Sequence, residues 1–201
     1  EELLEDVIED YPILIKPVEG FSDGEGILKF NGFQELKTHL MSKKLNYNFI
    51  IQNYISGYDI DCSVLCKNGE ILAFTIQKGN LEGVREFAPN LGVEFLYNEE
   101  LYLTVEKLMK SINWSGVAHI DMRYDQNDNT FKVIEINPRF WGSLDASLVS
   151  GVNFPYLYTL ASLNLGFSKP KYNDVKYLNL MGLKKTIKSN ILFLFNLKFI
   201  F

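Results

Sequence analysis

Two predicted β-hairpins restrict the folds that this chain can adopt. The first joins "DIDCSVLCK" to "EILAFTIQK" through Asn68-Gly69, a dipeptide that favours the tight turn between antiparallel strands. The second joins "GVAHIDMRY" to "FKVIEIN" through the polar segment "DQNDNT". Strands and helices alternate along the chain, but the strands of a hairpin must run antiparallel. The two hairpins therefore indicate an α+β fold rather than a doubly wound parallel sheet.

The other predicted elements follow from the spacing of apolar residues, which is helical in some segments and strand-like in others. The predicted helices are 1–10, 33–45, 98–112 and 144–163, with Asn31 as the cap of the second, and the additional strands are 11–16, 27–30 and 48–55. Residues 79–97 are rich in Gly, Pro and Asn, and we predict an irregular segment there.

Composition and charge exclude several classes of protein. The chain has 201 residues, 47% of them hydrophobic, enough for one large domain or two small ones. Its net charge of -5 argues against nucleic-acid binding, because affinity for the phosphate backbone needs clustered cations. The sequence has no signal peptide and no apolar run long enough to span a bilayer, so a membrane partner is not expected.

Cys62 and Cys66 lie in one predicted strand, where extended geometry holds their side chains too far apart for a disulfide. No zinc-type spacing accompanies them, because the two histidines, His39 and His119, lie far away in the sequence. We therefore predict free or packed thiols in a reducing, cytoplasmic location.

The second hairpin carries a candidate metal site. Residues two apart on a strand share a face, so Glu135 and Asn137 project together, with Val133 deeper on that face. If the turn centres on Asp128, Asp121 lies directly across from Glu135. Two adjacent carboxylates repel each other unless a cation or proton lies between them, and two acids with an amide suit Mg²⁺. The alternative is a solvated face whose acids pair with nearby arginines.

Two other segments suggest nucleotide binding. Lys16 ends an apolar strand and leads into the glycine-rich "PVEGFSDGEG", whose backbone amides could approach a polyphosphate, although the Walker pattern is absent. The strand end at Asn53 and Ile55 could bind an adenine edge. Asp59, Asp61 and Ser63 share the next strand face, where they could bind a ribose hydroxyl or form a plain hydrophilic surface.

Five segments follow one another along the chain: "YPILIKP", "VEGFSDGEGI", "IIQNYISGYD", "GVAHIDMR" and "VIEINPRFWGS". In this order they resemble the motifs of the ATP-grasp superfamily, over roughly residues 10 to 160. The last motif resembles the carboxylate-amine ligase branch, near carbamoyl-phosphate-synthase-like proteins. The resemblance implies an ATP-grasp fold, with two lobes that each combine an antiparallel sheet with helices and bind the nucleotide between them. The implied parts are a lid lobe at 1–56, a catalytic lobe at 57–168 and a C-terminal tail at 169–201.

The resemblance also implies roles for individual residues. Lys16 would bind the phosphates and act with Arg139 in catalysis, where the guanidinium would face the transferred phosphoryl group. The residues implied for the rest of ATP are Ser22, Gly24 and Gly26 over the phosphates, Gln52, Asn53 and Ile55 around adenine, and Asp59 at the ribose. Asp121, Glu135 and Asn137 would hold Mg²⁺, or Mn²⁺ in its place. Asp59 and Asp121 stand where the family usually has glutamate.

Several other residues have both a functional and a structural interpretation. His119 shares the face of Asp121 and could reach the edge of the site, or it is a hydrogen-bonded structural histidine. Lys78 is interpreted as facing the same region from a strand end, or as solvated. Arg85 is a second candidate anion contact or a surface arginine. Phe140 and Trp141 shape an acceptor pocket or belong to the core.

The resemblance implies an ATP-dependent ligase that joins a small-molecule carboxylate to an amine through an acyl phosphate. It is also compatible with a homodimer. The alternatives are an ATP-grasp carboxylase or carbamoyl-phosphate-type enzyme, and a non-catalytic ATP-binding regulatory module. The chain begins Glu1-Glu2 rather than with Met, so we expect a piece of a longer protein that is inactive alone. The closing "ILFLFNLKFIF" predicts a core element, with a membrane-surface segment as the alternative.

Overall fold

A computed structural model describes residues 8, 10–19, 24–42, 48–189 and 199–200 of the chain. The chain divides into two compact units. Glu1–Ile55 and Gly83–Pro89 form unit 1, and Ser56–Glu82 and Asn90–Phe201 form unit 2. The lid and catalytic roles assigned to the predicted lobes stay predictions.

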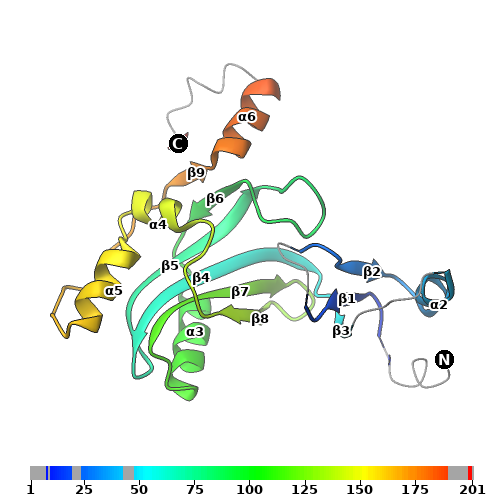
Figure 1. The fold of residues 1–201 in the computed structure, drawn as a ribbon, viewed down its shortest axis with the longest axis horizontal. Helices are drawn as coiled ribbons and strands as arrows, with labels where there is room; N and C mark the ends of the chain where they lie inside the picture. The colour runs from blue at the N-terminus through cyan, green and yellow to red at the C-terminus, as the bar shows by residue number, and fades with distance from the viewer. Residues whose placement is uncertain (1–7, 9, 20–23, 43–47, 190–198, 201) are drawn as a thin grey trace. The chain divides into compact units, whose positions relative to one another are not determined.

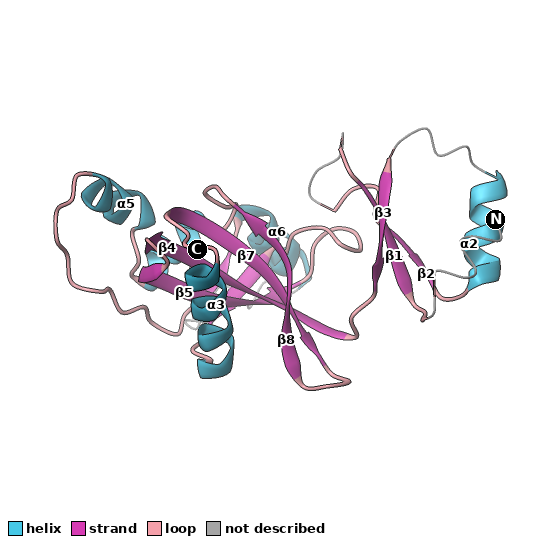
Figure 2. Ribbon diagram, turned by 90° about the horizontal axis from the view of Figure 1, so that it is seen from below, coloured by secondary structure: helices cyan, strands magenta, loops and turns pink. Residues whose placement is uncertain are grey.

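Unit 1 contains a small antiparallel sheet with one helix against it. Its described strands are β1 (Ile13–Pro17), β2 (Leu28–Phe30) and β3 (Phe49–Asn53), in the order β2-β1-β3. The helix α2 (Phe33–Ser42) lies beside them in Figure 2. Its buried Leu36 packs with Ile13, Ile15 and Phe30 to form the core of the unit. This face of β1 is apolar because alternate strand residues point to the same side.

The start of α2 differs from the predicted cap. The side chain of Asn31 accepts no hydrogen bond from a backbone amide of the helix. Its Nδ2 instead donates a hydrogen bond to the Glu35 carboxylate, at 3.4 Å. The backbone amide of Asn31 donates to the same carboxylate, at 2.8 Å. The acid in the first turn therefore reaches back to the residue before Gly32, one position further than the contact of a capping box.

Unit 2 is built on a larger sheet, shown in Figure 1, with the order β10-β9-β6-β5-β4-β7-β8 in the described part of the chain. The strands are β4 (Gly57–Lys67), β5 (Glu70–Leu81), β6 (Gly92–Phe95), β7 (Gly116–Asp125), β8 (Thr130–Asn137), β9 (Lys176–Leu178) and β10 (Phe199–Ile200). β9 and β10 are parallel and the other neighbours are antiparallel. Both predicted hairpins and the α+β class are confirmed.

β6 lies inside the segment predicted as irregular. It is four residues long and begins at Gly92, so the sequence alone gives it little strand signal. The tertiary structure supplies partners on both sides, because Val93 pairs with Gly79 of β5 and with Tyr177 of β9. Short strands of this kind are stabilised by the sheet rather than by their own sequence.

The helix α3 (Glu99–Ser111) covers one face of this sheet (Figures 1 and 2). The Asn98 side chain caps this helix, because its Oδ1 accepts a hydrogen bond from the backbone amide of Leu101 at 2.9 Å. Leu101, Val105 and Met109 are fully buried against the alternate residues of β4 and β7. The hydrophobic stripe of the helix and the two-residue alternation of the strands therefore meet on this face.

The opposite face is covered in part by two helices, α4 (Leu144–Ser150) and α5 (Phe154–Ser162), where the sequence predicted one helix over 144–163. The break falls at Gly151, which has a φ of 118°. Asn153 then caps α5, because its Oδ1 accepts a hydrogen bond from the backbone amide of Tyr156 at 3.1 Å. The redirected chain buries Phe154 and Leu157 against Leu65 of β4.

The predicted tail at 169–201 is joined to the sheet of unit 2. β9 pairs with β6, and the helix α6 (Leu180–Ser189) follows it. Gly182 lies so close to the Leu91 carbonyl oxygen that a Cβ there would stand 2.5 Å from it. Most of "ILFLFNLKFIF" lies outside the described residues. Within the described ones, no helix has both the length and the apolarity needed to cross a membrane.

Candidate functional site

Two rows of polar residues cross the sheet of unit 2 on the face opposite α3. Strand register places them side by side: Gln77, Asp61, Asp121 and Glu135 in one row, and Thr75, Ser63, His119 and Asn137 in the next, on β5, β4, β7 and β8 respectively. Cross-strand neighbours of this kind have their Cβ atoms about 5 Å apart, so each side chain can contact the next. The rows bring together residues from four separate stretches of the sequence.

The predicted pairing of Asp121 with Glu135 is present in the β7–β8 hairpin. Val133, in contrast, does not share their face. It pairs with Met122, so Ile134 is an extra residue between two paired positions, which is a β-bulge. The bulge lets Glu135 and Asn137 face the rows although Val133 stands on the side of Met122.

The Asn137 amide lies between the two carboxylates. Its Nδ2 donates to Asp121 Oδ2 at 3.0 Å and to Glu135 Oε1 at 2.8 Å. Its Oδ1 accepts from Arg139 Nη2 at 3.1 Å, and Arg139 Nη1 also donates to the Phe140 carbonyl at 3.2 Å. The four predicted residues therefore form one hydrogen-bonded chain: Asp121, Glu135, Asn137 and Arg139. The amide N–H groups of Asn137 lie between the two acids, in the position where a cation would neutralise their charge.

Burial and neighbouring charge make the Asp61 and Asp121 carboxyl groups resist ionisation. Burial, followed by the Glu135 carboxylate, raises the pKa of Asp121 to about 7. Burial, followed by the charge of Asp121, raises the pKa of Asp61 well above its usual range. Acids in such an arrangement either keep a proton or bind a cation, because like charges this close are costly. The donor chemistry of the cluster therefore fits a hard divalent cation.

His119 joins the two rows. Its Nε2 lies 3.2 Å from Asp121 Oδ1 and 3.9 Å from Asp61 Oδ2, and its Nδ1 lies 2.9 Å from the hydroxyl of the fully buried Ser63. Burial, followed by the positive charge of Arg139, lowers the pKa of His119 to about 4, so the ring is neutral at neutral pH. Asp61 and Ser63 were grouped with Asp59 from the sequence, which gave no sign that β4 lies beside β7.

Trp141 belongs to the core, which decides between its two interpretations. It is 5% exposed, stacks on His119 with ring centroids 5.4 Å apart, and meets Phe154 edge-on at 4.8 Å. Phe140 is 37% exposed. The buried ring of Trp141 holds one face of the imidazole and so limits how His119 can turn.

Two further candidates face different surroundings. Asp59 forms an ion pair with Arg123, whose Nη2 also donates to the Gly57 carbonyl at 2.9 Å. Lys78 does not face the rows. It pairs with Ile60, on the α3 side of the sheet, and its Nζ lies 3.8 Å from the centre of the Tyr58 ring. Strand alternation gives the physical reason, because Lys78 is one residue away from Gln77.

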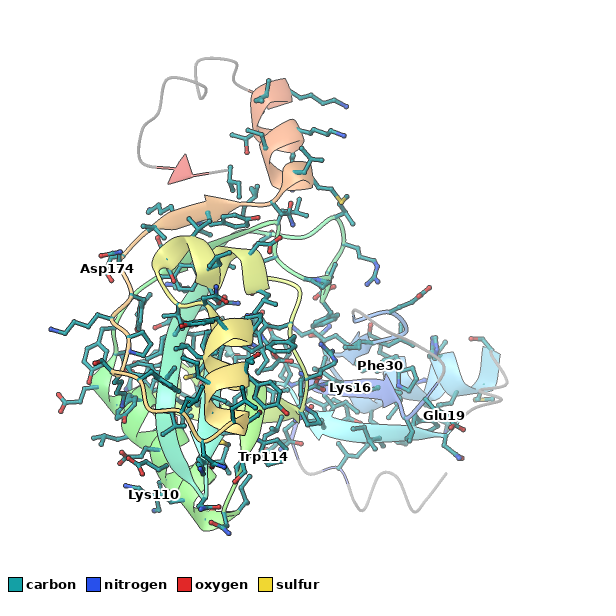
Figure 3. The ribbon with its side chains drawn as sticks, turned by 60° about the vertical axis from the view of Figure 1, so that its left-hand side comes forward. Lys16, Glu19, Phe30, Lys110, Trp114 and Asp174 are labelled. Atoms are coloured by element: carbon teal, nitrogen blue, oxygen red, sulfur yellow. The ribbon has the colours of Figure 1, made fainter. Side chains whose placement is uncertain are left out.

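The remaining candidates lie in unit 1. Lys16, labelled in Figure 3, is on β1 opposite Ile50, and Gln52 shares its face of the small sheet, away from α2. Asn53 is at the end of β3 and faces the other side, and Ile55 is the last residue of the first segment of unit 1. Ser22 lies outside the described residues. Arg85 is exposed.

Gly24 and Gly26 stand in a turn with φ of 73° and 75°. A Cβ on Gly24 would lie 1.9 Å from the Phe87 carbonyl oxygen. A close backbone approach within unit 1 therefore requires glycine there, whether or not a ligand binds.

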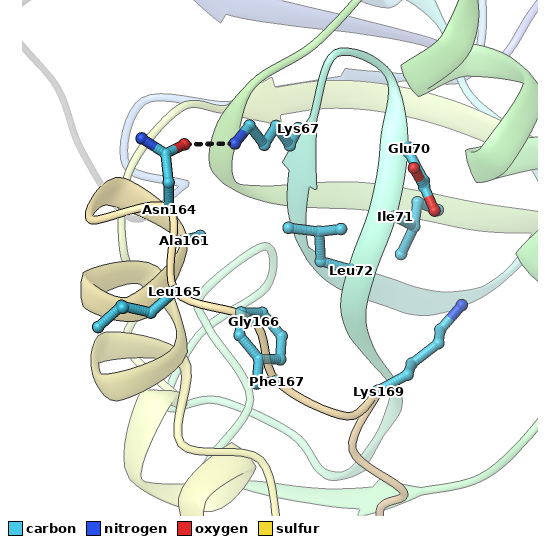
Figure 4. Close-up of a pocket in the computed structure, with 10 residues that line it drawn as sticks. All are labelled: Lys67, Glu70, Ile71, Leu72, Ala161, Asn164, Leu165, Gly166, Phe167 and Lys169. Carbon is cyan, nitrogen blue, oxygen red and sulfur yellow. Dashed lines mark hydrogen bonds between the residues drawn. The ribbon is translucent and has the colours of Figure 1, made fainter.

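Figure 4 shows a surface pocket of unit 2 that no residue of the polar rows lines. It is lined by Lys67 and Glu70 at the β4–β5 turn and by the segment 164–169 after α5. Lys67 Nζ donates to Asn164 Oδ1 at 2.7 Å across its edge. No residue singled out from the sequence lines this pocket, so the candidate site is defined by the rows and not by the cavity.

Comparison with solved structures gives the class of fold. N5-carboxyaminoimidazole synthetase from Staphylococcus aureus, in complex with ADP, matches with a TM-score of 0.68 at 16% identity, over 86% of this chain and 47% of that chain. L-amino acid ligase from Bacillus licheniformis matches with a TM-score of 0.55 at 23% identity, over 84% and 42%. At these identities the likeness shows the fold alone, which is ATP-grasp.

The chain belongs to the family described as "ATP-grasp in the biosynthetic pathway with Ter operon", which matches residues 46–181. A D-alanine--D-alanine ligase of Wolbachia pipientis subsp. Culex pipiens is 30% identical over 139 residues, covering 64% of this chain and 43% of that protein. A D-aspartate ligase of Enterococcus faecium is 35% identical over 63 residues, covering 31% and 15%. The resemblance drawn from the motifs is confirmed, and the chain spans about half or less of the length of these relatives.

Proposed function

We propose that this chain is part of an ATP-dependent ligase that joins a carboxylate to an amine through an acyl phosphate. The observation that carries the proposal is the hydrogen-bonded chain of Asp121, Glu135, Asn137 and Arg139 at the end of one hairpin. In this scheme ATP phosphorylates the substrate carboxylate, and the amine then displaces phosphate. Membership of the ATP-grasp family and the ligases among its relatives support this reaction class.

Asp121, Glu135 and Asn137 are the residues that would hold Mg²⁺, and the oxygens of two acids and an amide suit this ion. When bound, Mg²⁺ supplies charge neutralisation to the phosphates of ATP. For Asn137 to offer its oxygen, its amide must turn over, because Oδ1 now accepts from Arg139. That turn would also release the Arg139 guanidinium, which we assign to the transferred phosphoryl group and the developing oxyanion.

The proposed nucleotide contacts are those that the motifs imply. Lys16 would bind the phosphates, under the loop that contains Ser22, Gly24 and Gly26. The backbone and side chains around Gln52, Asn53 and Ile55 would bind adenine. Asp59 would bind the ribose; its side chain is 59% exposed and so is accessible although it pairs with Arg123.

The relatives named above act on amino acids by name, as D-aspartate ligase and D-alanine--D-alanine ligase. We therefore propose amino acids as the first substrates to test, either as the amine or as the carboxylate. An amide product formed with ATP consumption would support the ligase. ATP consumption that depends on bicarbonate would favour the carboxylase or carbamoyl-phosphate alternative, and nucleotide binding without phosphate release would favour a regulatory module.

The binding step can be tested by calorimetry on the full-length protein with a non-hydrolysable ATP analogue. We expect binding that requires Mg²⁺ and weakens about tenfold or more in Lys16→Ala and Glu135→Ala, because each loses a contact with a charged partner. Asp128→Ala is the matched control, since this exposed acid is on the same hairpin and contacts Lys132 instead. Absence of Mg²⁺-dependent binding in the unmodified protein would refute the proposal.

A further inference from the structure

The polar rows contain a second group of convergent metal-ligand atoms, on the β4 side of Asp121. Asp61, His119 and Asp121 each offer one ligand atom, and these three atoms lie within 4.8 Å of one another. The site predicted from the sequence used the β8 side of Asp121 and oxygen donors only. The second group differs in having a nitrogen donor and in drawing on β4.

Asp121 presents a different oxygen to each group. Its Oδ1 faces His119 Nε2 at 3.2 Å, and its Oδ2 faces the Asn137 amide at 3.0 Å. A carboxylate with its two oxygens turned to opposite sides can ligate two ions at once. The geometry therefore separates the two groups, although they share one residue.

We propose that Asp61, His119 and Asp121 form a binding site for a divalent first-row transition-metal ion, next to the proposed Mg²⁺ site and joined to it by Asp121. Two carboxylates balance the charge of such an ion, and a neutral imidazole supplies its nitrogen lone pair. The proposal does not rest on the ligase function, because the metal alone is the ligand.

The distances are those of ligands that can share an ion. Donor atoms about 2.1 Å from one metal are about 3.0 Å apart at a right angle and about 4.2 Å apart when opposite each other. The observed 3.2 Å from Nε2 to Asp121 Oδ1 and 3.9 Å from Nε2 to Asp61 Oδ2 fall in this range. All three ligand atoms lie within 4.8 Å of one another, so they must draw together slightly to reach one ion.

The surroundings of His119 resemble the support that metal-bound histidines require. The Ser63 hydroxyl lies 2.9 Å from Nδ1, and the Trp141 ring stacks on the imidazole with an interplanar angle of 16°. A hydroxyl can donate to Nδ1 or accept from it, so this bond persists when Nε2 gives its lone pair to a metal. The imidazole is therefore held with Nε2 toward the two acids.

The site is reachable from solvent. The side chains of Asp61, His119 and Asp121 are 19%, 11% and 36% exposed. The mixed donor set selects among ions, because imidazole favours transition metals over Mg²⁺. By the usual order of affinities, Zn²⁺ should bind more tightly than Mn²⁺.

Mn²⁺ added to the nucleotide-free, full-length protein is the probe, with pulsed EPR to detect coupling to the nitrogen of an imidazole ligand. We expect a nitrogen-coupled Mn²⁺ that Zn²⁺ displaces at lower concentration than Mg²⁺ does. The coupling should vanish in His119→Gln, and the affinity should fall about tenfold or more in Asp61→Asn. His39→Gln is the matched control for the other histidine and should keep the signal.

Glu135→Gln distinguishes a separate site from a single shared one. The nitrogen-coupled Mn²⁺ should persist in this variant, because Glu135 belongs only to the oxygen-donor group. Loss of the coupling in Glu135→Gln, or its absence in the unmodified protein, would overturn the proposal, as would unchanged binding in Asp61→Asn. Circular dichroism tests whether each variant is folded. If His119→Gln does not fold, Asp61→Asn still tests the site, because it leaves the stacking of Trp141 on His119 intact.

Discussion

At the scale of single residues, the chemistry of the site depends on what lies within one side chain's reach. The Asn137 amide donates to two acids and accepts from Arg139, so its orientation decides whether the acids meet an N–H pair or an amide oxygen. The two ring nitrogens of His119 likewise contact two partners, the Ser63 hydroxyl and the Asp121 carboxylate. The sequence identified Asp121, Glu135, Asn137 and Arg139 as one group because three of them fall within five residues on one strand and the loop that follows it.

Cys62 and Cys66 give a prediction at this scale. Both are free and buried beneath α3, as expected from their spacing. Burial raises the pKa of Cys62 and raises that of Cys66 to about 12. Because the thiolate is the reactive form, we expect iodoacetamide to label both very slowly in the native protein and rapidly in denaturant. Mass spectrometry measures the labelling, and rapid native modification of either cysteine would contradict this environment.

At the scale of elements, local signals predicted the hairpins and turns, and tertiary contacts decided the rest. Asn68-Gly69 fixes a tight turn whatever surrounds it. The bulge at Ile134 has no comparable signal, yet it moves Val133 to the other face. β6 and β9 are too short to be recognised alone and pair with each other across a long stretch of sequence.

The break between α4 and α5 gives a prediction for an element. Gly151 has a φ of 118°, and a Cβ there would also lie 3.2 Å from the Lys171 carbonyl oxygen. We expect Gly151→Ala to lower the free energy of unfolding by about 1–3 kcal/mol, the cost of a strained backbone. Gly166→Ala is the matched control, because a Cβ there meets nothing within 4 Å, and it should change stability by less than about 1 kcal/mol. Urea denaturation measures both, and equal effects would contradict the strain at Gly151.

At the scale of the whole molecule, the chain has separate hydrophobic cores in its two units. Leu36 is fully buried in the core of unit 1, and Leu101 is fully buried in that of unit 2. We expect Leu36→Ala and Leu101→Ala each to destabilise its own unit by about 2–5 kcal/mol. Hydrogen exchange should then accelerate in β1 and β3 for the first variant, and in β4 and β7 for the second. Acceleration of both sets of strands by either variant would show that the units unfold together.

The sequence by itself determined the antiparallel hairpins, the α+β class and the carboxylate pair of Asp121 and Glu135. These features depend on residues close in the chain, whose relative positions are fixed by turn chemistry and strand alternation. Only the tertiary structure placed β4 beside β7, which brings Asp61 and Ser63 to Asp121 and His119. The order of strands in a sheet is set by how distant apolar faces pack, as α3 packs on β4 and β7, and no local pattern records it.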